Sequence, residues 1–157
     1  MTRIGMKLDE KKLAALAKAA VAARARAYCP YSNHPVGVAL VSASGKIYAG
    51  ANVEIAHYKG VCAEASAISA MITAGERGIR AVVVVGPSME YLCTPCGDCR
   101  QRLREFCAPD VQIYSLWKDG RLGAVTTLAE LLPAPCLGRV PRLDQPDAQQ
   151  VARHLSL

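Results

Sequence analysis

Three cysteines far apart in the chain constrain the fold more than any other feature. Cys62 is followed by Ala63 and Glu64, and a second group reads Pro95-Cys96-Gly97-Asp98-Cys99. Three thiolates with this spacing can bind one zinc ion and leave its fourth coordination position open for water. Glu64 follows the first ligand so closely that it can reach the same water. The chain is therefore expected to fold so that both cysteine groups and Glu64 meet.

Other uses of these cysteines remain open. A Cys-x-x-Cys pair alone also occurs in redox proteins, structural zinc sites and iron-sulfur carriers. A redox pair needs no third cysteine before a helix, whereas a structural zinc site normally has a fourth protein ligand. Cys93 could be that ligand. If the fourth position is open, zinc lowers the pKa of bound water from about 15.7 to about 7, which favours hydrolysis.

Length and composition predict one α/β domain in a reducing compartment. A chain of 157 residues can bury a core without disulfides. Its seven cysteines are an odd number, and three are better explained as ligands than as disulfide partners. We see no signal peptide, and the apolar run at 81–85 is far shorter than the roughly 20 residues that span a bilayer. We expect a cytoplasmic protein without a membrane segment.

The formal net charge of +6 invites a nucleic-acid interpretation. However, the basic residues are spread along the predicted helices. One Phe, one Trp and six Tyr also give few platforms on which single-stranded bases can stack. We therefore favour a solvated basic face over nucleic-acid binding.

Alternating strand and helix patterns predict a three-layer α/β/α fold with a central mixed sheet of about five strands. The expected helices cover residues 8–28, 63–74, 95–107 and 128–132. The expected strands cover residues 36–41, 46–51, 79–86, 111–116 and 124–126. We divide the chain into a catalytic domain at 1–133 and a C-terminal tail at 134–157. The tail is expected to dock on the domain or on a partner subunit.

Four collinear motifs resemble the small, homotetrameric cytidine deaminases. They are Tyr28-Cys29-Pro30-Tyr31-Ser32-Asn33-His34-Pro35-Val36-Gly37, Asn52-Val53-Glu54, Cys62-Ala63-Glu64 and Pro95-Cys96-Gly97-Asp98-Cys99-Arg100-Gln101. Glu130-Leu131-Leu132-Pro133 matches as well. The likeness covers roughly residues 10 to 135 and implies a cytidine deaminase-like fold.

The resemblance also implies a reaction and a cofactor. Zn²⁺ would be bound by Cys62, Cys96 and Cys99. Glu64 would protonate ring nitrogen N3 while the activated water attacks C4, and would then pass a proton to the departing amine. The implied substrate is a small nucleoside, cytidine or deoxycytidine, in pyrimidine salvage.

The remaining site residues follow from the same resemblance. Asn52 and Glu54 match residues that hydrogen-bond the ribose, although a polar loop end is the simpler interpretation of each in isolation. His34 stands where the family usually has an aromatic residue that packs on the pyrimidine, and could equally be a turn residue. Cys136 and Leu137 stand near the place of a phenylalanine that closes over the site.

A further departure concerns the charge of the zinc site. Ala65 replaces an arginine that offsets the negative charge of three thiolates on one dication. Arg100 is retained and could serve alone, or could be a solvated helix residue. Blasticidin S deaminases also lack the replaced arginine, and the loop from 52 to 62 has a length between those of the two families. A deaminase of modified cytosine nucleosides is thus the alternative enzyme, and a structural zinc protein that binds nucleic acid is the alternative of another class.

Overall fold

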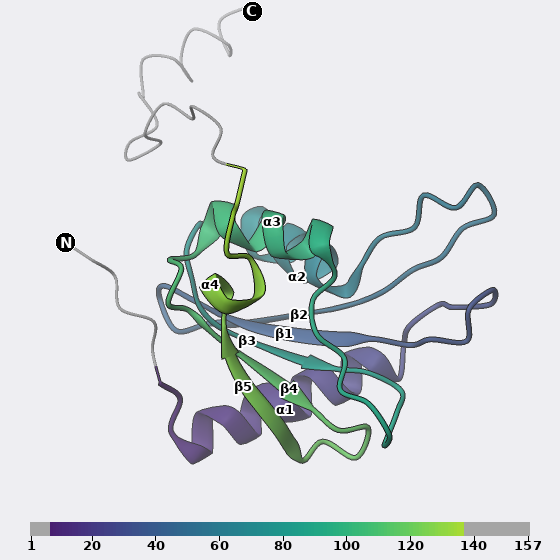
Figure 1. Cartoon of the computed structure of the whole chain (residues 1–157), viewed down its shortest axis with the longest axis horizontal. Coiled ribbons are helices and arrows are strands. Elements are labelled where there is room, and N and C mark those ends of the chain that lie inside the picture. The colour runs from purple at the N-terminus through teal and green to yellow at the C-terminus, as the bar shows by residue number, and fades with distance from the viewer. Residues whose placement is uncertain (1–6, 137–157) are drawn as a thin grey trace, which may run out of the picture.

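The computed structural model describes residues 7–136 as a five-stranded mixed sheet covered by helices on both faces (Figure 1). The strand order is β2-β1-β3-β4-β5. In chain order, the elements are α1 (Glu10–Arg24), β1 (Gly37–Ser42), β2 (Ile47–Ala51), α2 (Ala63–Thr73), β3 (Ile79–Val85), α3 (Gly97–Phe106), β4 (Gln112–Leu116), β5 (Leu122–Thr127) and α4 (Leu128–Leu131).

Strand pairing brings three loops to one end of the sheet. β1 is antiparallel to both β2 and β3, β3 is parallel to β4, and β4 is antiparallel to β5. Gly37, the first residue of β1, pairs with Ala51 at the end of β2 and with Val85 at the end of β3. The loops before β1, after β2 and after β3 therefore leave the sheet at the same end.

The core forms two layers, one on each face of the sheet. Alternate residues of β1 point to opposite faces, so Val38 and Leu40 pack with α2 and α3, whereas Ala39 and Val41 pack with α1. Strand β3 is buried along its whole length except at Arg80. This burial confirms that its continuous valine run is covered on both sides, and the observed layers confirm the predicted three-layer α/β/α fold.

Most predicted element boundaries agree with the structure to within two residues, but the end of the first helix does not. The helix begins where Asp9 accepts a hydrogen bond from the Lys12 amide, at 2.7 Å. It ends at Arg24, four residues before the predicted end. The backbone of Tyr28 instead forms a parallel bridge with Val53, which no local pattern could indicate.

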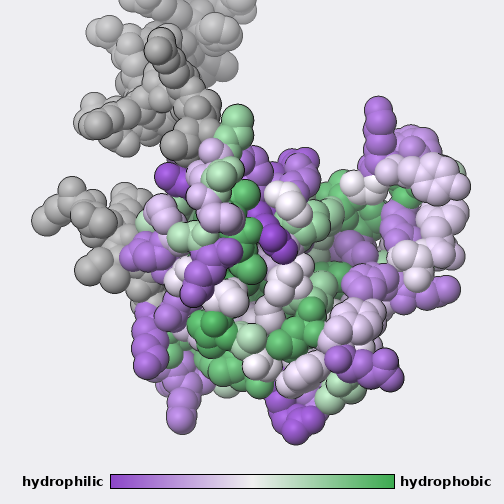
Figure 2. Space-filling model, viewed as in Figure 1, coloured by the Kyte–Doolittle hydropathy of each residue, from purple (hydrophilic) through white to green (hydrophobic). Residues whose placement is uncertain are grey.

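The surface over β5 is partly apolar (Figure 2). Leu122 and Val125 on this edge strand expose 47% and 44% of their surface. The positive charge is therefore not concentrated on this edge. Within residues 7–136, no helix is both long enough and apolar enough to cross a membrane. Most of the predicted tail at 134–157, including Leu137, lies outside the described residues.

Candidate active site

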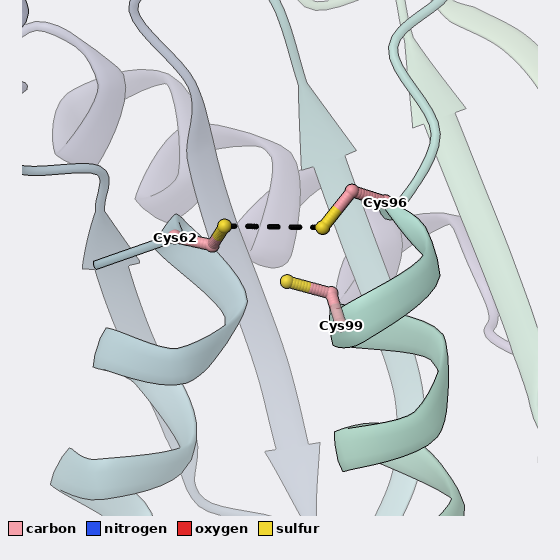
Figure 3. Close-up of side chains that lie close together, drawn as sticks. All are labelled: Cys62, Cys96 and Cys99. Carbon is pink, nitrogen blue, oxygen red and sulfur yellow. Dashed lines mark hydrogen bonds between the residues drawn. The ribbon is translucent and has the colours of Figure 1, made fainter. Parts of the chain in front are cut away.

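The structure brings the three predicted ligand cysteines together where α2 and α3 begin (Figure 3). Cys62 is the N-cap of α2, Cys96 is the N-cap of α3, and Cys99 lies in the first turn of α3. The Sγ atoms of Cys62 and Cys96 are 3.9 Å apart, and all three Sγ atoms lie within 4.8 Å of one another. Two helix N-termini thus direct their sulfur atoms at one point.

The two N-cap thiols are not used to cap their own helices. Neither Cys62 nor Cys96 makes a side-chain capping hydrogen bond, so both sulfur atoms stay free to face the cluster. A helix N-terminus by itself favours a thiolate at its N-cap. Instead burial raises the pKa of the Cys62 thiol, and the negative charge of neighbouring Cys96 and Glu64 raises it further.

Glu64 places a carboxylate against this cluster. It lies in the first turn of α2 with only 4% of its surface exposed. The Cys99 thiol donates a hydrogen bond to Glu64 Oε2 at 3.2 Å. Burial raises the pKa of Glu64, and burial together with the charge of Glu64 raises that of the Cys99 thiol. Three thiols and a carboxylate therefore crowd one partly buried space.

This arrangement fits a zinc ion. Two Zn–S bonds of about 2.3 Å at a tetrahedral angle place the sulfur atoms about 3.8 Å apart, close to the observed 3.9 Å. Groups that are all acidic oppose one another's ionisation, and a bound dication removes that conflict. The predicted cofactor, Zn²⁺, is thus supported by geometry and by charge.

Cys93 does not join the three cysteines. It is absent from the group of described residues whose ligand atoms lie within 4.8 Å of one another. Its β-carbon instead packs against Gly86, where an added methyl group would lie only 2.5 Å away. The position of Cys93 gives no support to a closed, four-cysteine structural site.

Asn52 and Glu54 hold the loop that precedes β1. The Asn52 side chain accepts from the Val36 amide at 2.8 Å and donates to the His34 carbonyl oxygen at 3.0 Å. Glu54 Oε2 accepts from the amides of Tyr31 and Ser32, and the Ser32 hydroxyl donates to Oε1. These bonds, chiefly that from the Ser32 hydroxyl, lower the pKa of Glu54 and keep it ionised at neutral pH.

A pocket of about 350 Å³ opens beside this loop. Its lining comes from the loops before β1 and after β2: Tyr31, Ser32, Glu54, Ile55, Tyr58 and Gly60. Glu54 is the predicted site residue that borders this pocket, and the cysteine cluster does not line it. The two groups of predicted site residues therefore mark two separate parts of the candidate site.

Arg100 bonds to the main chain around the second cysteine group. Its guanidinium donates to the carbonyl oxygen of Pro95 at 2.6 Å and to that of Leu131 at 2.9 Å. Within residues 7–136, no hydrogen bond joins this guanidinium to a cysteine sulfur. Arg100 thus ties the loop before α3 to α4, and its predicted role of offsetting thiolate charge stays a prediction.

Sequence patterns missed three residues that shape the site. Tyr91 stacks on the His34 ring, Gln101 binds the backbone of Cys136, and Gly50 allows β2 to approach α2 closely. Each acts through a partner far away in the sequence. Gln101 belongs to a motif that we had already singled out, whereas Tyr91 and Gly50 carry no local pattern that would identify them.

Comparisons with known proteins agree with the fold and the cysteine cluster. A model of the cytidine and deoxycytidylate deaminase zinc-binding region matches residues 10–115. The cytidine deaminase of Sporosarcina psychrophila is 40% identical over 127 residues, which cover 80% of this chain and 90% of the relative. The crystal structure of cytidine deaminase from Burkholderia pseudomallei matches with a TM-score of 0.73 and 39% identity, and the match covers 82% of this chain and all of that one. The chain therefore belongs to the family of cytidine and deoxycytidylate deaminases.

Proposed function

We propose that this protein is a zinc-dependent aminohydrolase that converts cytidine or deoxycytidine to uridine or deoxyuridine and releases ammonia, in pyrimidine salvage. The observation that carries the proposal is the buried Glu64 carboxylate, 3.2 Å from Cys99 Sγ in the three-cysteine cluster. Relatives at about 40% identity are cytidine deaminases, so they favour cytidine over a blasticidin-type substrate.

In this proposal, Cys62, Cys96 and Cys99 hold the metal and Glu64 moves the protons. Bound zinc would act as a Lewis acid and lower the pKa of a water molecule to about 7. Glu64 accepts a proton from the attacking water and delivers it to ring nitrogen N3. It then accepts the second proton, from the hydroxyl group newly attached to C4, and passes it to the departing amino group. A C4–O bond forms, the C4–N bond breaks, and ammonia leaves.

The environment of Glu64 supports this role. Burial raises its pKa, and a proton-transfer group is most effective when its pKa lies near the working pH. The Cys99 contact also fixes one carboxylate oxygen next to the metal ligands. Glu64 therefore lies where the reaction needs a proton carrier, and its burial favours the protonated form.

Asn52 and Glu54 are proposed to bind the sugar. One N–H of the Asn52 amide bonds the His34 carbonyl oxygen, and the Asn52 side chain also forms a hydrogen bond with the Cys29 thiol. Each Glu54 carboxylate oxygen can accept a further bond, and the residue borders the 350 Å³ pocket. Sugar hydroxyl groups would bind these side chains while the base lies toward the cysteines.

The proposal includes a homotetramer in the cytoplasm. Tyr58 exposes 89% of its surface, and Val53, Ile55 and Val61 of the same loop are also exposed. An apolar loop of this kind gains from being covered by another copy of the chain. All seven cysteines are free, which suits a reducing compartment. Light scattering should give four times the chain mass of 16.7 kDa, and a monomer would contradict the tetramer.

The activity is tested by ammonia release and the matching absorbance change from cytidine, deoxycytidine, cytosine and blasticidin S. We expect zinc-loaded protein to act on cytidine or deoxycytidine. Turnover of blasticidin S alone would replace the proposed substrate with the alternative. No ammonia from any of the four compounds would contradict the proposed function.

A further inference from the structure

The His34 main chain is fixed, whereas its imidazole has one neighbouring ring. The His34 amide donates to Ser32 Oγ at 3.1 Å, and Asn52 donates to the His34 carbonyl oxygen at 3.0 Å. Among residues 7–136, no hydrogen bond uses either imidazole nitrogen. The ring instead stacks on Tyr91, with centroids 6.3 Å apart and planes 5° from parallel. Tyr91 therefore gives the imidazole an aromatic ring against which it lies flat.

Tyr91 is itself held in place by its loop. Ser88 Oγ accepts hydrogen bonds from the Tyr91 amide at 3.3 Å and from the Glu90 amide at 2.9 Å. The next residue, Leu92, packs so closely over Gly123 that an added methyl group there would lie 2.3 Å from it. Because hydrogen bonds and packing hold this loop in place, the Tyr91 ring can keep the His34 ring in one orientation.

The stacked pair joins the loop that carries Ser32, which lines the pocket, to the loop that leads to Cys96. Its loops leave the same end of the sheet, because Gly37 of β1 pairs with Val85 of β3. On one side, the His34 amide donates to Ser32 Oγ, and the Ser32 hydroxyl donates to Glu54. On the other, Tyr91 lies in the loop between β3 and α3, five residues before Cys96.

We propose that Tyr91 is a positioning residue that holds the His34 imidazole as a flat platform for the nucleobase. The proposal rests on the proposed function, since a nucleoside with its sugar at Glu54 and its base toward the cysteines spans this pair. Parallel rings in offset contact attract each other, and the inner ring is thereby kept from turning edge-on. Tyr91 acts through His34 and need not touch the substrate.

The test compares Tyr91→Leu, which removes the ring, with Tyr91→Phe, which retains it. Met89→Ala serves as a control, because Met89 is an exposed side chain of the same loop at 45% exposure. We expect Tyr91→Leu to raise the KM for cytidine about 3- to 10-fold, the range that an aromatic pair contributes, with kcat nearly unchanged. Tyr91→Phe and Met89→Ala should stay within about twofold of the wild type.

A double-mutant cycle with His34→Ala shows whether Tyr91 acts through His34. If it does, Tyr91→Leu adds little to the KM of the His34→Ala protein. Equal effects of Tyr91→Leu in both backgrounds, or none in either, would overturn the inference. Zinc content and melting temperature are measured for each variant, because loss of either would raise KM by a different route.

Nuclear magnetic resonance gives a second measurement that does not require turnover. The chain has three histidines, so His34→Ala assigns the His34 ring protons. We expect cytidine to shift these protons in the wild type and to shift them much less in Tyr91→Leu. If zinc-loaded protein binds cytidine at His34 but releases no ammonia, the proposed function fails and this inference stands. If the His34 protons do not respond to cytidine, or respond equally in both proteins, the inference fails.

Discussion

Replacing Gly50 with alanine should move the helix that carries Cys62 and Glu64. A β-carbon on Gly50 would lie 2.4 Å from the Ala67 amide nitrogen and 2.5 Å from the Ala63 carbonyl oxygen. Ordinary contacts begin near 3.4 Å, so β2 and α2 must separate by about 1 Å. Both opposing atoms belong to the helix backbone, so a change of side-chain rotamer cannot relieve the clash.

This separation should lower both stability and zinc affinity. Overpacking in a core costs about 1–3 kcal/mol, which corresponds to a fall of about 3–10 °C in the melting temperature of a chain of this size. Metal sites accept ligand distances within about 0.2 Å of ideal, so a shift of about 1 Å in the first turn of α2 should weaken zinc binding as well.

The assays are thermal unfolding of the metal-free protein and competition for zinc with a chelator. Gly97→Ala is the matched control, because a β-carbon on Gly97 meets no atom within 4 Å although the residue directly follows Cys96. Gly97→Ala should retain both properties. If Gly50→Ala also kept the wild-type melting temperature and zinc affinity, the close β2–α2 packing would not set the position of Cys62.

Three further predictions concern the thiols and the C-terminal contact. Burial raises the pKa values of the Cys62 and Cys99 thiols, so a zinc ion must displace their protons when it binds. The affinity of the protein for zinc should therefore fall as the pH falls, and calorimetry in different buffers should detect the released protons. The Gln101 side-chain amide makes two hydrogen bonds with the Cys136 backbone, at 2.8 and 2.9 Å. Gln101→Ala should therefore speed hydrogen exchange at the Cys136 amide, and an unchanged exchange rate would refute this contact. Buried Cys107, with its pKa raised to about 12, should resist alkylation in the folded protein while exposed Cys136 reacts, and mass spectrometry can compare them.

The sheet and the cysteine cluster were predictable because each depends on a strong local pattern. The valine run of β3 requires cover on both faces, and the pleat then divides the residues of β1 between two cores. Cys62 directly precedes one predicted helix, and the Cys96–Cys99 pair lies at the beginning of another. Zinc chemistry then predicts that the two helix N-termini meet, but only the family resemblance and the structure separate Cys93 from the other three cysteines.

Features that depend on pairing across the chain were not predictable. The end of α1 was placed too late because Tyr28 bonds to the distant segment around Asn52. The stacking of His34 on Tyr91 requires two loops to leave the same end of the sheet. Gly50 has an ordinary local setting, and only the approach of α2 shows why it has no side chain. In each case tertiary contact overrides local propensity.

Cytidine turnover by Glu64→Gln at matched zinc content tests the central claim most directly. Glutamine keeps the shape of the side chain but cannot carry the proton, so wild-type zinc binding should persist while kcat falls by about 10²- to 10⁴-fold. Equal zinc content measured in both proteins separates this effect from loss of the metal. Turnover close to that of the wild type in the zinc-loaded variant would show that Glu64 is not the proton carrier, and would contradict the mechanism.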